Sequence, residues 1–97
     1  MPHYITLFRC TQKGAENIKQ SLSCLDAGKK AIEAAGGKPK GFYLPMGQYD
    51  AIAIAEFPND EAGMRVSLAT ASQGNVRSET PRAFTEEEYR KLIASLP

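Results

Sequence analysis

The stretch that decides the fold runs from residue 41 to residue 57 and reads GFYLPMGQYDAIAIAEF. Large apolar side chains recur at every second position of its two halves, namely at Phe42, Leu44, Met46, Ile52 and Ile54. A period of two is typical of β-strands. Between the halves, Gly47 is free to adopt a positive φ, and Asp50 offers a carboxylate to nearby backbone N–H groups, as turns require. The stretch therefore predicts a β-hairpin.

The composition bounds the class of protein. The chain has 97 residues, of which 42% are hydrophobic and 24% charged, and this is typical of a single globular domain spanning residues 1–97. A chain of this size buries only about two-thirds of its unfolded surface, so a homodimer or a higher oligomer is expected. No apolar run approaches the roughly 18 residues that cross a bilayer, and the N-terminus lacks a signal-peptide pattern. We expect a cytoplasmic protein without a membrane partner.

The net charge and the small number of metal-binding residues exclude further classes of protein. The net charge is +1 without a basic stripe, so nucleic acid is not an expected partner. The only histidine is His3, and the two cysteines, Cys10 and Cys24, form no CxxC pair, so we expect no metal site and no cofactor. His3 and Cys10 would lie about 23 Å apart along one strand, too far to act as a base and a nucleophile. The sequence assigns no role to these three residues.

The elements around the hairpin follow from local patterns. Residues 4–10 are rich in β-branched and aromatic side chains and predict a first strand. A helical pattern begins at Ala15, with a second segment starting near Ser21 or Ser23, and ends at Gly36 and Gly37. Its expected apolar stripe is Ile18, Leu22, Leu25 and Ile32. After the hairpin, Asn59 caps a second helix. A polar edge strand over 75–84 precedes a last helix, which a capping box at Thr85–Glu88 begins.

The first and third strands each present two faces. Ile5 and Leu7 form the better core candidate on the first strand. The other face is mixed in size and polarity, and we interpret it as a dimer interface in preference to a pocket wall. Its residues are Tyr4, Thr6, Phe8, Ala51, Ala53, Ala55 and Phe57.

The order of elements predicts an α+β fold. The order β-α-β-β-α-β-α with right-handed crossovers gives the ferredoxin-like βαββαβ arrangement with an extra C-terminal helix. Its four-stranded antiparallel sheet has the strand order 4-1-3-2. Proline supports this topology, because Pro45 and Pro81 belong to the two strands that it places at the edges of the sheet.

Three segments resemble the GYD domain family: PHYITLFRCTQKGAENIK, GGKPKGFYLPMGQYDAIAIAEFPND and GNVRSETPRAFTEEEYRKLI. The glycine, tyrosine and aspartate that name the family correspond to Gly47, Tyr49 and Asp50. The resemblance covers nearly the whole chain and implies a dimeric α+β barrel, in which two sheets pack face to face. It implies no settled activity, because the family is uncharacterised. One departure is Ser21–Cys24, where relatives tend to have a proline-led helix start.

The predicted topology gathers polar residues at two ends of the sheet. Asp50 and Tyr49 are the catalytic candidates, since the first can accept a proton and the second can polarise a carbonyl. The ligand-binding candidates at the same end are Arg9, Gln48, Arg77 and Gly47. The alternative is structural: Asp50 bonds to N–H groups of its own turn, and Tyr49 packs against the partner subunit. His3, Lys40, Glu56 and Arg82 gather at the other end.

Two functions remain open from the sequence. The first is a small-molecule-binding domain of the dimeric α+β-barrel type. The alternative is a cofactor-independent enzyme, similar to a monooxygenase or an isomerase, that transfers a proton on a small organic substrate. We favour the first, because the sequence lacks a convergent nucleophile, base and orienting group.

Overall fold

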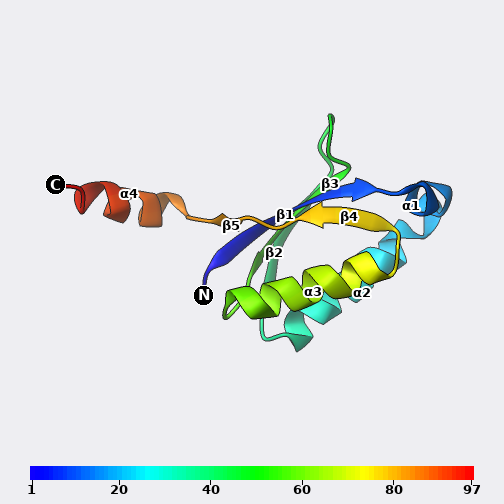
Figure 1. The fold of residues 1–97 in the computed structure, drawn as a ribbon, viewed down its shortest axis with the longest axis horizontal. Helices are drawn as coiled ribbons and strands as arrows, with labels where there is room; N and C mark the ends of the chain where they lie inside the picture. Colours follow the sequence, from blue (N-terminus) through cyan, green and yellow to red (C-terminus); the bar gives the residue numbers. More distant parts are fainter.

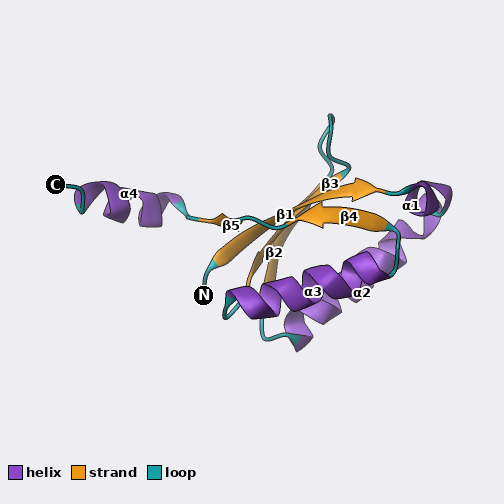
Figure 2. Ribbon diagram, viewed as in Figure 1, coloured by secondary structure: helices purple, strands orange, loops and turns teal.

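The computed structural model describes residues 1–97 and shows an α+β fold with an antiparallel sheet and four α-helices (Figure 2). The elements are, in order, β1 (His3–Cys10), α1 (Gln12–Glu16), a 3-10 helix (Ile18–Gln20), α2 (Ser21–Ala34), β2 (Lys38–Tyr43), β3 (Ala51–Glu56), α3 (Asp60–Ser72), β4 (Val76–Glu79), β5 (Arg82–Ala83) and α4 (Glu86–Ala94). None of the helices has the length and apolar character needed to span a bilayer.

The sheet runs in the order β2-β3-β1-β4, and the short strand β5 also pairs with β1. Every pairing is antiparallel. The two central strands contain no proline, as expected. Pro45 follows the end of β2, and Pro81 lies between β4 and β5. A proline has no N–H to donate to a neighbouring strand, and this explains why both positions lie outside the ladder.

The predicted last strand is broken in the middle. The pattern predicted one strand over 75–84, whereas the structure has β4 and β5 with Thr80 and Pro81 between them. The Pro81 carbonyl still accepts a hydrogen bond from the Ile5 N–H at 3.1 Å, so the chain between β4 and β5 stays beside β1. The first strand of the hairpin also ends earlier than predicted, because β2 ends at Tyr43 and Pro45 lies beyond it.

Helices α2 and α3 lie on the same side of the sheet (Figure 1). Between these helices and the sheet lies the core, which consists of four buried residues: Tyr4, Ala55, Phe57 and Ala62. The rings of Tyr4 and Phe57 are 5.6 Å apart and meet edge to face. Our assignment of the two faces was therefore wrong. Tyr4, Ala55 and Phe57 face the helices, not a partner.

The opposite face of the sheet carries the branched apolar side chains. In the β1–β3 register, Ile5 pairs with Ile54 and Leu7 pairs with Ile52. Paired residues share a face and alternate with Tyr4 and Thr6, so they point away from the helices. All four are only half-buried. We call this surface, Ile5, Leu7, Ile52 and Ile54, the open face.

The predicted first helix is divided into α1, the 3-10 helix and α2. Thr11 caps α1 by accepting a hydrogen bond from the Gly14 N–H, and α2 begins at Ser21 without a side-chain cap. Only part of the predicted apolar stripe is covered, since Ile32 packs on the core while Leu22 is 73% exposed. The C-terminal end of α2 is thus the part that meets the core.

Helix α4 begins as predicted but lies apart from the body. Thr85 Oγ1 accepts from the Glu88 N–H at 3.2 Å, and Glu88 Oε1 accepts from the Thr85 N–H at 3.0 Å, which confirms the capping box. Figure 1 shows α4 continuing the line of β5 past the end of the sheet. The molecule is therefore elongated, with extents of 52 × 30 × 17 Å.

Candidate functional site

The turn between β2 and β3 was predicted to carry the catalytic residues. It rises from the sheet on the side away from the helices (Figure 1). Asp50 anchors it, because its Oδ2 accepts from the Cys10 N–H at 2.8 Å and its own N–H donates to the Phe8 carbonyl at 2.8 Å. Gly47 has a φ of 142°, a value that a residue with a side chain rarely adopts. The Asp50 carboxylate thus bonds to β1, not to its own turn.

The arginines beside this turn lie close together. The Arg9 guanidinium is 5.0 Å from the centre of the Tyr49 ring. Arg9 and Arg77 are directly opposite each other in the β1–β4 register, an unfavourable pairing of like charges that an anion would relieve. Gln48 is exposed at the turn. The catalytic role of Asp50 and Tyr49, and the binding role of Arg9, Gln48, Arg77 and Gly47, stay predictions.

At the opposite end of the sheet, three of the four expected polar residues meet. His3 Nε2 is 3.4 Å from Glu56 Oε1, and Lys40 Nζ is 3.5 Å from Glu56 Oε2. Arg82 instead stacks on the Phe84 ring, with its guanidinium carbon 4.9 Å from the ring centre. The cluster of His3, Lys40 and Glu56 thus joins β1, β2 and β3. Nowhere do three or more histidine, cysteine, aspartate or glutamate side chains gather in a way that could hold a metal ion.

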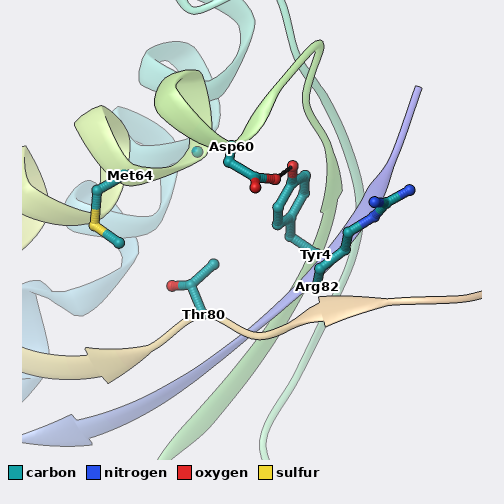
Figure 3. A pocket seen from close by; sticks show the side chains of 6 residues that line it. Tyr4, Asp60, Met64, Thr80 and Arg82 are labelled. Carbon is teal, nitrogen blue, oxygen red and sulfur yellow. Dashed lines mark hydrogen bonds between the residues drawn. The ribbon is translucent and has the colours of Figure 1, made fainter.

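A cavity of about 200 Å³ lies between the start of β1, the first turns of α3 and the break between β4 and β5. Six residues line it: Tyr4, Asp60, Gly63, Met64, Thr80 and Arg82. Figure 3 shows the Tyr4 hydroxyl directed at the Asp60 carboxylate, with Thr80 and Met64 on the other side of the space. The Tyr4 hydroxyl donates a short hydrogen bond to Asp60 Oδ1. The cavity therefore combines a carboxylate, a phenol, a hydroxyl and a nearby guanidinium.

Local structure explains how these side chains are positioned. Asp60 is the first residue of α3, where the helix dipole favours a negative charge, and Asn59 caps the helix by accepting from the Ala62 N–H at 2.9 Å. Tyr4 comes from a central strand and is only 4% exposed. The hydroxyl of Thr80 lies 2.9 Å from that of Ser67 and 3.4 Å from that of Thr6. Both sides of the cavity are thus fixed by hydrogen bonds.

The electrostatics of the cavity keep Tyr4 protonated. The hydrogen bond to Asp60 is the main reason that the pKa of the Tyr4 phenol is raised from 10.0, and burial and the Asp60 charge add to it, while Arg82 opposes it. The neutral phenol donates a hydrogen bond to Asp60 Oδ1 and leaves the second carboxylate oxygen available to a ligand. The site can therefore accept a hydrogen bond from a polar molecule.

The sequence did not point to this cavity. Tyr4 was assigned to an interface, and Asp60 was given no binding or catalytic role. A signal was nevertheless present. In an antiparallel β1–β3 pair, the residues that follow β3 lie beside the first residues of β1. The Phe57 N–H indeed donates to the Pro2 carbonyl at 3.1 Å, and Asp60 follows three residues later.

Comparison with curated proteins finds no match to this chain. Comparison with protein families finds one, described as the GYD domain, whose model matches residues 4–93. The matched range includes both the turn of Gly47, Tyr49 and Asp50 and the residues that line the cavity. Since it covers nearly all of the 97 residues, the chain belongs to the GYD domain family.

Proposed function

We propose that this chain is a small-molecule-binding subunit of a homodimer, and that its ligand occupies the cavity beside Tyr4 and Asp60. The observation that carries the proposal is the buried Tyr4 phenol held on the Asp60 carboxylate at the wall of a cavity. Tyr4 is buried and Asp60 is exposed, so the pair joins the core to the solvent-accessible cavity, and a few polar groups placed in this way at a pocket wall are a common feature of binding sites.

The side chains around the cavity favour a particular ligand chemistry. Asp60 attracts an ammonium or hydroxyl group, whereas Arg82 and Thr80 favour a carboxylate or a carbonyl. The Met64 thioether adds an adaptable apolar contact. The volume of about 200 Å³ is below the roughly 300–1,000 Å³ of sites for drug-sized ligands. We therefore expect a small amino acid or hydroxy acid.

Packing supports the homodimer. The strand order β2-β3-β1-β4 with helices on one side supports a ferredoxin-like arrangement, in which the other side of the sheet is bare. A compact monomer of this mass is expected to expose about 5,500 Å², whereas the chain exposes 6982 Å². The excess of about 1,500 Å² exceeds the roughly 800 Å² that each partner contributes to a stable interface. A second copy on the open face, giving a dimeric α+β barrel, would cover part of this excess.

A second candidate function uses the same pair of residues. In an unsaturated substrate, the Asp60 carboxylate can take a proton from the carbon between a carbonyl and a double bond, which gives a dienolate, and return the proton to the far carbon of that double bond, so that the double bond moves without a cofactor. The Tyr4 phenol, whose single proton is donated in the hydrogen bond to Asp60, orients the carboxylate, and Arg82 would stabilise the negative charge that develops on the carbonyl oxygen. The hydrogen-bonded Tyr4–Asp60 pair favours this alternative.

The test is a thermal-shift screen with small amino acids, hydroxy acids and amines. A ligand present at 100 times its Kd should stabilise the protein by about 2.7 kcal/mol. The Asp60→Asn variant should lose this stabilisation, whereas Asp26→Asn, which changes an exposed acid of α2, should keep it. A third variant, Asp50→Asn, tests whether the ligand binds at the turn instead. Loss of the effect in Asp50→Asn alone would move the site to the turn and contradict the proposal.

Following the same samples by NMR separates the two functions. A ligand that stays unchanged supports a binding module, while conversion of the ligand that disappears in Asp60→Asn supports the enzyme. A ligand that stabilises Asp60→Asn, Asp26→Asn and Asp50→Asn equally would exclude both proposed functions.

A further inference from the structure

Helix α4 has an apolar side that the rest of its own chain does not cover. Three of its large apolar residues, Tyr89, Leu92 and Ile93, recur at the spacing i, i+3, i+4 on one side of the helix, and Leu96, two residues past the last helical residue Ala94, continues this spacing. Their exposed fractions are 58% for Tyr89, 49% for Leu92, 50% for Ile93 and 65% for Leu96. Figure 1 shows the helix beyond the end of the sheet, away from α2 and α3. We call these four residues the α4 stripe.

The remaining sides of α4 are stabilised within the helix. Arg90 pairs with Glu86 at 2.9 Å and Lys91 with Glu87 at 3.6 Å, both four residues apart. Such pairs contribute only about 0.3–0.5 kcal/mol each. An isolated helix shorter than about 12–15 residues is marginal in water, and α4 has nine. The helix therefore needs a surface for its stripe.

The connection to the body directs α4 outward. Strand β5 is fixed to β1 by the pairs His3–Ala83 and Tyr4–Arg82. Only Phe84 and Thr85 follow before the helix, and Thr85 is held extended, with φ −69° and ψ 165°, by the capping box. The link is thus short and straight, and it carries the stripe past the edge of its own sheet.

We propose that α4 of one copy packs its stripe on the body of a second copy, so that the two chains clasp each other by their C-terminal helices. The inference rests on the proposed homodimer but not on its ligand. The excess exposed surface favours a second copy as the partner, because this excess is larger than one standard interface requires. The position of the link favours it too. Strand β5 pairs with β1, which carries Ile5 and Leu7 of the open face, so α4 starts from the strand on which a second copy would pack. A second copy also brings exposed apolar side chains of its own, among them Leu44 and Met46 on the turn.

Amide hydrogen exchange on the full chain tests the clasp. In the assembled protein the amides of residues 89–94 should exchange at least ~10-fold more slowly than in an unfolded peptide, and dilution should remove the difference. Leu92→Ala with Ile93→Ala should abolish this protection, although alanine favours helix. The matched control, Glu87→Ala with Lys91→Ala on the opposite side, should keep it.

Cross-linking identifies the copy that α4 meets. In a one-to-one mixture of ¹⁴N- and ¹⁵N-labelled protein, linked peptides that join Lys91 to a body lysine should carry mixed labels. Links with uniform labels only, or protection in a monomer, would show that α4 folds back on its own chain and would overturn the clasp. A dimer with unprotected α4 would overturn the clasp and leave the homodimer standing. A monomer with unprotected α4 would overturn both.

Discussion

At the scale of single residues, Tyr4 gives the most direct test of the cavity. Its hydrogen bond to Asp60, with burial, raises the pKa of its phenol, so it should ionise above 10.0. Asp60→Asn removes the negative charge and should lower that pKa toward the ordinary value. Tyrosine NMR signals followed over a pH titration measure the change. A Tyr4 signal that titrates at 10.0 in the unaltered protein would contradict the geometry of the pair.

The same pKa shift makes a prediction for stability. A phenol whose pKa is higher in the folded than in the unfolded chain favours folding while it is protonated. The contribution is fully present below pH 10.0 and is lost as the pH rises through the folded-state value. The free energy of unfolding, measured with urea, should therefore fall across this alkaline range. Tyr4→Phe should remove that part of the dependence on pH.

Cys10 provides an independent test of the turn. Burial raises the pKa of its thiol, and the nearby Asp50 charge adds to the effect. Because the thiolate is the reactive form, Cys10 should react with iodoacetamide more slowly than Cys24, which is exposed. Asp50→Asn should speed the reaction of Cys10 without changing that of Cys24. Mass spectrometry of the two peptides gives both rates, and an unchanged Cys10 rate would contradict the predicted effect of the charge.

At the scale of elements, the cap of α3 controls one side of the cavity. Asn59→Ala removes the side-chain oxygen that accepts from the Ala62 N–H, which should cost about 1 kcal/mol. For a domain of this length the melting temperature should fall by roughly 4–8 °C. Asn59→Asp keeps an acceptor and is the matched control. If the melting temperature of Asn59→Ala equalled that of Asn59→Asp, the cap would not stabilise α3.

Elements whose signals are local could be predicted from the sequence. The capping box joins Thr85 to Glu88, three residues away, and both of its hydrogen bonds are present. The cavity depends instead on Tyr4 and Asp60, which are 56 residues apart and meet only through the pairing of β1 with β3. The break at Thr80 and Pro81 was likewise hidden, because the polar pattern over 75–84 continues through it. Sequence patterns placed the elements, but tertiary pairing formed the site.

At the scale of the whole molecule, the sheet is apolar on both faces. Alternation shows that Tyr4, Ala55 and Phe57 share one face and that Ile5 and Ile54 share the other, but it does not show which face the helices cover. The branched aliphatic side chains of Ile5 and Leu7 made their face the better core candidate, and this prediction was wrong. Helices α2 and α3 cover the face with small alanines, where Gly63 lets α3 approach: a Cβ there would lie 3.2 Å from the Phe57 ring. The aliphatic residues of the open face are left without cover, and this is the pattern expected of a surface that meets another subunit.

This two-sided pattern leads to a prediction about assembly. Ile54→Glu places a charge on the open face, directly opposite Ile5. Burying an unpaired carboxylate between two sheets is costly, so the variant should be monomeric at concentrations where the unaltered protein is dimeric. Leu68→Glu makes a comparable change on the exposed side of α3 and should remain dimeric. Sedimentation velocity gives the mass of each species, and near-ultraviolet circular dichroism shows whether the monomer is still folded. A folded Ile54→Glu dimer would place the interface elsewhere, because no arrangement that packs the open faces together can leave that carboxylate in water.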